Sequence, residues 1–94
     1  MLEHGKVKRE RTIEAKIKMI SEFVGKRFIH SGNGFTYLVT DIIWDCRDDQ
    51  WALVHAQVVP DNPDRSILYT RPYDNFFGCR CENGKFVNRF CEVS

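Results

Sequence analysis

The spacing of apolar residues predicts one helix near the start of the chain, over residues 12–24. The apolar side chains recur at intervals of three and four residues: Ile13, Ile17, Met19, Ile20, Phe23 and Val24. This spacing is typical of one face of an α-helix. Thr12 is suited to the N-cap, and Gly25 to the left-handed conformation that follows many helix ends. We expect the apolar face to pack against a sheet.

After Gly25 the pattern changes to short strands separated by turn residues. The expected strands are residues 26–30, 35–44, 51–59 and 66–71, then a hairpin of 76–81 and 86–91, with one helical turn at 73–75. Glycine and asparagine favour tight turns at 31–34 and 83–84. A change of phase around Asp41 predicts a β-bulge.

These elements predict an α+β fold that is mainly β. An N-terminal helix is followed by a small five-stranded, strongly bent β-barrel over residues 26–92, because no parallel crossover unit is present. Two faces alternate along residues 51–59. The small residues Ala52, Val54, Ala56 and Val58 are expected to crowd against the core. The amphipathic face of Trp51, Leu53, His55 and Gln57 needs a cover, from the helix, another subunit or a ligand.

The four cysteines invite a metal or disulfide interpretation, which the hairpin register argues against. A turn at 83–84 places Cys91 about 17 Å from the position opposite Cys81, too far for a shared metal or a disulfide. Cys79 and Cys81 would share an apolar face with Phe86 and act as small buried hydrophobic residues. We therefore expect neither a metal site nor a cofactor.

Composition and charge narrow the class of protein. Ninety-four residues with 43% apolar and 29% charged side chains fit one globular domain, 12–94, after a basic tail, 1–11. The net charge of +1 disfavours general nucleic-acid coating. The first 18 residues hold six basic and three acidic side chains, which we interpret as a solvated tail and helix face rather than an anion-binding arm. With neither a secretory leader nor a long apolar run, the expected location is cytoplasmic, without a membrane partner.

Two runs near the C-terminus form a recognisable pattern, YTRPYDNFF at 69–77 and GKFVNRF at 84–90. Together with residues nearer the N-terminus, they resemble the small bacterial and phage domain called domain-of-unknown-function family 1653. The matching positions are Phe28, Gly32, Asn33, Tyr37, Arg71, Pro72, Phe76, Gly84, Lys85, Arg89 and Phe90. The resemblance covers about residues 26–92, and the helix and the loop through Pro60 and Pro63 depart from it. It implies a small SH3-like barrel with no established activity.

The residue types favour a non-catalytic binding protein for a nucleotide-type anionic ligand. Aromatic rings can stack on a base, a guanidinium can hold phosphate oxygens, and the 32–34 turn can offer backbone N–H groups. The candidate ligand-binding residues are Asn33, Trp44, Trp51, His55, Tyr69, Arg71 and Tyr73. The alternative is that the rings pack the barrel and Arg71 forms a surface salt bridge with Asp74.

A barrel of this size has little concave volume, so the ligand is expected between subunits of a homo-oligomer. A phage protein that sequesters a cyclic-nucleotide immune signal would have these properties. The alternative function is a protein-interaction or nucleic-acid-binding barrel that uses a strand edge or the basic segment 6–18. A hydrolase or nuclease that uses His55, Cys46 or an aspartate of the 45–49 turn ranks last, since no acid–base constellation is specified.

Overall fold

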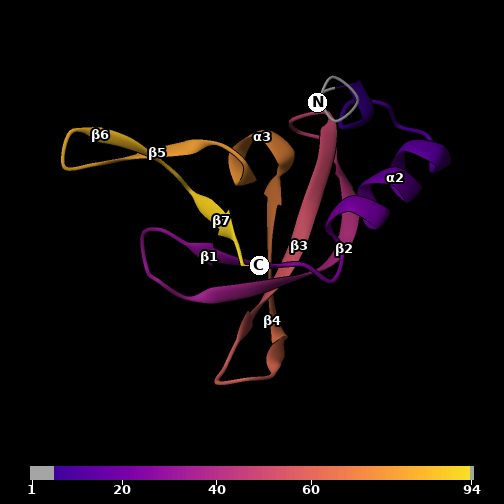
Figure 1. Cartoon of the computed structure of the whole chain (residues 1–94). Coiled ribbons are helices and arrows are strands. Elements are labelled where there is room, and N and C mark those ends of the chain that lie inside the picture. Colours follow the sequence, from indigo (N-terminus) through magenta and orange to yellow (C-terminus); the bar gives the residue numbers. More distant parts are fainter. Residues whose placement is uncertain (1–5, 94) are drawn as a thin grey trace.

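The predicted N-terminal helix is present as α2, Ile13–Phe23 (Figure 1). The computed structural model describes residues 6–93, so the first five residues of the predicted tail lie outside the described part of the chain. The Thr12 hydroxyl accepts the Ala15 N–H at 3.1 Å, which confirms the N-cap. Gly25 has a φ of 90°, which confirms the predicted left-handed residue after the helix.

The face that α2 buries differs from the prediction. Ala15, Met19 and Phe23 lie in the core, whereas Ile13 and Ile17 are 75% and 60% exposed. The buried positions recur every four residues and begin at an alanine, whose small side chain lets the helix approach the sheet closely. The predicted apolar face is therefore wrong for Ile13 and Ile17, which do not pack against the sheet.

Seven antiparallel-paired strands follow α2 in the described part of the chain. They are β1 Arg27–His30, β2 Thr36–Asp45, β3 Gln50–Val58, β4 Pro63–Pro72, β5 Cys79–Glu82, β6 Lys85–Asn88 and β7 Phe90–Glu92; α3, Tyr73–Phe76, lies between β4 and β5. One five-stranded sheet has the order β4-β3-β2-β1-β7, and β5 and β6 form a separate hairpin. The fold is α+β and mainly β. β4 and β7 are sheet edges, so the strand pairing does not close the predicted barrel.

The predicted bulge in β2 is confirmed. The register between β2 and β3 shifts between Val39 and Asp41. Because of this extra residue, Tyr37 and Val39 before the shift and Ile42 after it all turn into the same core.

The face of β3 that joins the core is the opposite of the predicted one. Trp51 and Leu53 belong to the hydrophobic core, which also contains side chains of α2, α3 and β7, and His55 is only 2% exposed. Ala52 and Ala56 lie on the other side of the sheet, where side chains of the neighbouring strands bury them. The large side chains of Trp51 and Leu53 fill the space between the sheet and the helices. The small side chains of Ala52 and Ala56 are buried by the neighbouring strands alone.

Residues 6–11 are anchored to the rest of the protein, although the charged side chains of Lys6, Arg9 and Arg11 stay exposed as the charge pattern suggested. Val7 is part of the core. The Trp51 backbone N–H donates to the Lys8 carbonyl at 2.9 Å, and its indole N–H donates to the Glu10 carbonyl at 2.8 Å. This segment therefore fastens onto the start of β3.

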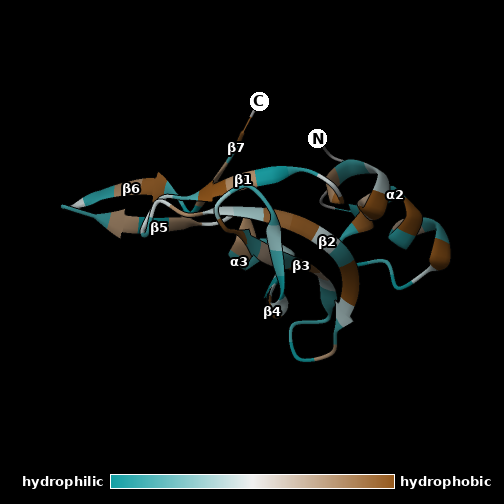
Figure 2. Ribbon diagram, turned by 90° about the horizontal axis from the view of Figure 1, so that it is seen from below, coloured by the Kyte–Doolittle hydropathy of each residue, from teal (hydrophilic) through white to brown (hydrophobic). Residues whose placement is uncertain are grey.

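The C-terminal hairpin has the predicted register but not the predicted burial. Cys81 pairs with Phe86, yet Phe86 is 82% exposed, and all four cysteines are exposed. The hairpin projects from the end of the molecule opposite α2 in both views (Figures 1 and 2). Cys91 lies in β7, which leaves the hairpin and pairs with β1, so Cys91 faces Ile29 and does not belong to the second hairpin strand as predicted. The expectation of buried thiols is wrong because the hairpin face lies outside the core.

Candidate functional site

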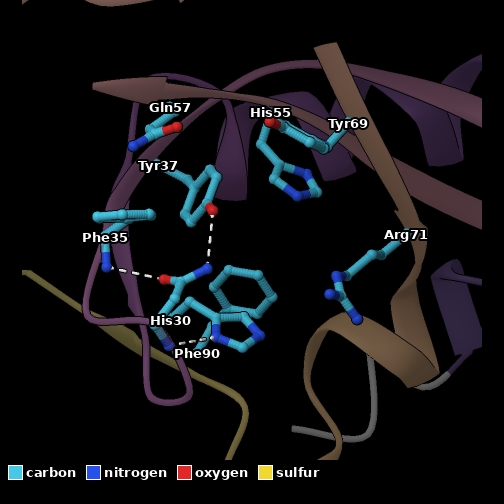
Figure 3. A pocket seen from close by; sticks show the side chains of 9 residues that line it. His30, Phe35, Tyr37, His55, Gln57, Tyr69, Arg71 and Phe90 are labelled. Carbon is cyan, nitrogen blue, oxygen red and sulfur yellow. Dashed lines mark hydrogen bonds between the residues drawn. The ribbon is translucent and has the colours of Figure 1, made fainter. Parts of the chain in front are cut away.

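A pocket of about 350 Å³ opens where β1, β2, β3, β4 and β7 meet (Figure 3). We call it the Arg71 pocket, and its lining residues are His30, Asn33, Phe35, Tyr37, His55, Gln57, Tyr69, Arg71 and Phe90. Its volume lies at the lower end of the range for small-molecule sites, about 300–1,000 Å³.

The aromatic wall of the pocket is a consequence of strand register. His55 of β3 pairs with Tyr69 of β4, and Gln57 of β3 pairs with Tyr37 of β2, so these side chains share one face of the sheet. The His55 and Tyr69 rings are stacked, with centroids 5.9 Å apart and planes at 28°. Tyr37 meets the His55 ring edge-on at 5.5 Å. The wall therefore consists of mutually supporting rings.

The turn between β1 and β2 is held by its own hydrogen bonds. Two N–H groups of the 32–34 turn donate to His30 Nδ1, at 2.9 and 3.3 Å, and the third donates to the His30 carbonyl at 2.8 Å. Asn33 accepts the Phe35 N–H at 2.8 Å and donates to the Tyr37 hydroxyl at 3.1 Å. The expected use of these backbone N–H groups for a ligand is therefore wrong, and Asn33 acts by orienting Tyr37.

The two imidazoles of the pocket have opposite tautomers. His30 Nδ1 accepts two N–H bonds, so its proton lies on Nε2. His55 Nδ1 lies 3.0 Å from the Leu53 carbonyl oxygen, which can only accept, so its proton lies on Nδ1 and Nε2 is an acceptor. Burial lowers the pKa of both side chains, and Arg71 lowers the pKa of each further; the Leu53 carbonyl partly opposes this for His55. Both shifts favour the neutral form of the ring.

Arg71 is the cation of the pocket. Its Nη1 donates to Asn75 Oδ1 at 2.7 Å, and its guanidinium lies over the Phe90 ring, 5.5 Å from the centroid. Burial and the nearby Arg89 lower the pKa of Arg71, and the guanidinium stays charged. No carboxylate within residues 6–93 pairs with it.

The alternative partner of Arg71, Asp74, is bound elsewhere. Its carboxylate pairs with the Lys8 ammonium and lies 3.3 Å from Arg9 Nη2. Hydrogen bonding from Lys8 is the largest cause of the lowered pKa of Asp74. The alternative, an Arg71–Asp74 salt bridge, is therefore absent between these two described residues, and the charge of Arg71 is available to a ligand.

Four of the seven predicted ligand-binding residues line the Arg71 pocket: Asn33, His55, Tyr69 and Arg71. The other three lie elsewhere. Trp44 and Trp51 form an edge-to-face pair with centroids 5.0 Å apart. Tyr73 packs against Phe77 at 4.8 Å and lies under the Lys8 ammonium. All three support the packing of the N-terminal segment and α2.

Sequence reasoning missed five of the lining residues: His30, Phe35, Tyr37, Gln57 and Phe90. The signal for Tyr37 and Gln57 was present in the two-residue alternation of β2 and β3, since both share a face with His55. Phe90 could not be placed in this way, because it reaches the pocket only through the pairing of β7 with β1.

Cys46 and His55, the candidate nucleophile and base, lie far apart in the fold. Cys46 lies in the turn after β2, and His55 lies five residues beyond the start of β3, about 17 Å along the strand. A Cys46–His55 nucleophile pair is therefore excluded.

Within residues 6–93, no three histidine, cysteine, aspartate or glutamate side chains gather as a metal site. No helix in that span has both the length and the apolar character needed to cross a membrane.

Comparison of the chain with protein-family models, with curated proteins and with solved structures found no match. The resemblance to domain-of-unknown-function family 1653 stays a prediction, and the pocket itself is the basis for a functional proposal.

Proposed function

We propose that this protein is a non-catalytic binding protein that holds a nucleotide-type anionic ligand in the Arg71 pocket. The observation that carries the proposal is a guanidinium that has no carboxylate partner among residues 6–93 and lies beside a wall of aromatic rings. A planar guanidinium suits phosphate oxygens, and ring faces suit a base. Phe35 and Tyr69 are 50% and 41% exposed and have surface left for such stacking.

The neutral imidazoles favour binding over acid–base chemistry. Protonation of His30 would need its Nδ1, which two backbone N–H groups already occupy. The ring is therefore suited to donate a hydrogen bond from Nε2 and not to carry a mobile proton. Binding without turnover would suit sequestration of a cyclic-nucleotide immune signal by a phage protein in the cytoplasm.

We also propose that the protein forms a homo-oligomer and has an SH3-like architecture. β4 exposes Ile67 and Leu68, 56% and 52%, next to the pocket residue Tyr69, so a second copy on this edge would enclose the ligand. A meander of four strands, followed by a helical turn and a last strand beside the first, supports the barrel-like order that the resemblance implies.

Isothermal titration calorimetry of the full chain with nucleoside monophosphates and cyclic nucleotides tests the proposal. Replacing Arg71 with glutamine should weaken binding about ten- to a hundredfold, the effect of losing a hydrogen bond from a charged group. Arg65→Gln is the matched control, since Arg65 is an exposed arginine of the same strand outside the pocket. No heat with any nucleotide, or equal affinity for wild type and Arg71→Gln, would overturn the proposal.

The exposed edge of β4 also favours a second candidate, a protein-interaction module that adds a partner strand. The basic segment is a weaker nucleic-acid site than its sequence suggested, because Lys8 and Arg9 are bound to Asp74. Binding to DNA or RNA that weakens steeply with salt and with neutralisation of Arg9 and Arg11 would instead favour a nucleic-acid function.

A further inference from the structure

A second cavity adjoins the Arg71 pocket across β4. We call it the outer cavity; its volume is about 440 Å³, and its lining residues are Arg47, Asp48, Tyr69, Thr70, Arg71, Pro72 and Asn75. Tyr69 and Arg71 line both cavities. The two spaces are therefore neighbours that share these two residues.

The Arg71 guanidinium contacts residues of both cavities. It lies over the ring of Phe90, which lines the Arg71 pocket, and it donates to Asn75, which lines the outer cavity. A phosphate bound by Arg71 would thus lie at the boundary between an aromatic space and a polar one.

The outer cavity brings a second arginine from a different element. Ala52 of β3 pairs with Pro72 of β4, so the turn that precedes β3 lies beside the C-terminal end of β4. Asp45 Oδ1 accepts the Arg47 N–H at 2.9 Å and the Asp48 N–H at 3.3 Å, which fixes this turn. Within residues 6–93, Arg47 forms no ion pair, even with the adjacent Asp48.

We infer that the outer cavity is a second phosphate subsite, in which Arg47 binds a phosphate joined to the one at Arg71. This inference rests on the proposed function and narrows its ligand. The base of the nucleotide lies against the rings of the Arg71 pocket, and the first phosphate lies at Arg71. The second phosphate, joined to the first, lies at Arg47. The ligand class is a nucleotide with at least two linked phosphates, in place of a nucleoside monophosphate.

The charge of Asp48 provides a test of the subsite. Its carboxylate lines the same cavity as Arg47 and would repel a second phosphate. Removing that charge should strengthen the binding of a diphosphate and leave a monophosphate unaffected. Opposite effects at two adjacent residues are specific to a ligand that reaches this turn.

Calorimetry with matched nucleoside mono- and diphosphates of each base tests the inference. In the wild type, the diphosphate should bind at least about tenfold more tightly than the monophosphate. Arg47→Gln should bring that ratio close to one without changing monophosphate affinity, and Asp48→Asn should raise diphosphate affinity severalfold. Arg71→Gln should weaken both ligands, and Arg65→Gln neither.

The outcomes separate this inference from the proposed function. Equal affinity for mono- and diphosphates in the wild type, or an unchanged ratio in Arg47→Gln, overturns the second subsite alone. No binding of any nucleotide overturns both.

Discussion

Gln50 and Asp74 exchange two hydrogen bonds. The Asp74 backbone N–H donates to Gln50 Oε1 at 2.8 Å, and Gln50 Nε2 donates to the Asp74 carboxylate at 3.3 Å. Gln50 is only 4% exposed, and it begins β3, whereas Asp74 lies in the helical turn after β4. This pair therefore joins the strand that carries His55 to the turn that follows Arg71.

The Gln50 side chain should contribute measurably to stability. Replacing it with alanine leaves the Asp74 N–H without its partner, at an expected cost of about 1–3 kcal/mol in the free energy of unfolding. Urea unfolding followed by circular dichroism measures the change. Gln57→Ala is the matched control, because Gln57 is half-buried in the same strand and lines the pocket instead of bridging to α3. Equal effects of the two substitutions would contradict the assigned role of Gln50.

The histidine tautomers can be read directly by nuclear magnetic resonance. Long-range proton–nitrogen spectra should show the proton on Nε2 of His30 and on Nδ1 of His55 at neutral pH, as their hydrogen bonds require. Both rings should titrate below the ordinary histidine pKa of about 6.5. A ring that titrates at or above that value would contradict its neutral environment.

The same pKa shift predicts how stability depends on pH. A folded-state pKa below the unfolded one means that the unfolded chain binds more protons in acid. The contribution of His55 is therefore fully present above about pH 6.5 and falls as the pH drops toward its folded pKa. Urea unfolding between pH 7 and pH 5 should show a shallower decline for His55→Gln than for the wild type. An equal or steeper decline for the variant would refute the assignment.

Two apolar residues of α2 should differ sharply in their effect on stability. Met19→Ala removes a side chain that is 1% exposed and should cost about 2–4 kcal/mol. Ile17→Ala, in the same helix, changes a side chain that is 60% exposed and should stay within about 0.5 kcal/mol. A larger loss for Ile17 would mean that another molecule covers that face in solution.

The four thiols should react without denaturant. Cys46, Cys79, Cys81 and Cys91 are all exposed, so native protein should titrate four thiols with an aromatic disulfide reagent. Replacing Cys81 with serine should change the free energy of unfolding by less than about 0.5 kcal/mol, because it fills no core space. A thiol that reacts only after unfolding would contradict its exposure.

Local chemistry was sufficient to predict the turns, the caps and the bulge. Thr12, Gly25 and the phase change near Asp41 each have a residue-level signature that does not depend on distant contacts. The buried faces of the strands could not be predicted from local chemistry. Whether Leu53 or Ala52 faces the core depends on where α2 docks, and both faces of β3 contain apolar residues.

The pocket was half predictable for a similar reason. Tyr69 and Arg71 alternate along one strand, which places them on one face from sequence alone. His30 and Phe90 join them only because β7 leaves the C-terminal hairpin and pairs with β1. Phe90 also packs against Phe76, with ring centroids 4.1 Å apart, and this long-range contact has no local signature in the sequence.

Proline stands at both ends of β4, at Pro63 and Pro72. Neither has an amide proton, so an incoming strand can find main-chain donors only between them. This limits docking on that edge to a short, bounded span. Tyr69 and Arg71 fall inside this span, so any chain that docks there would lie directly at the mouth of the site.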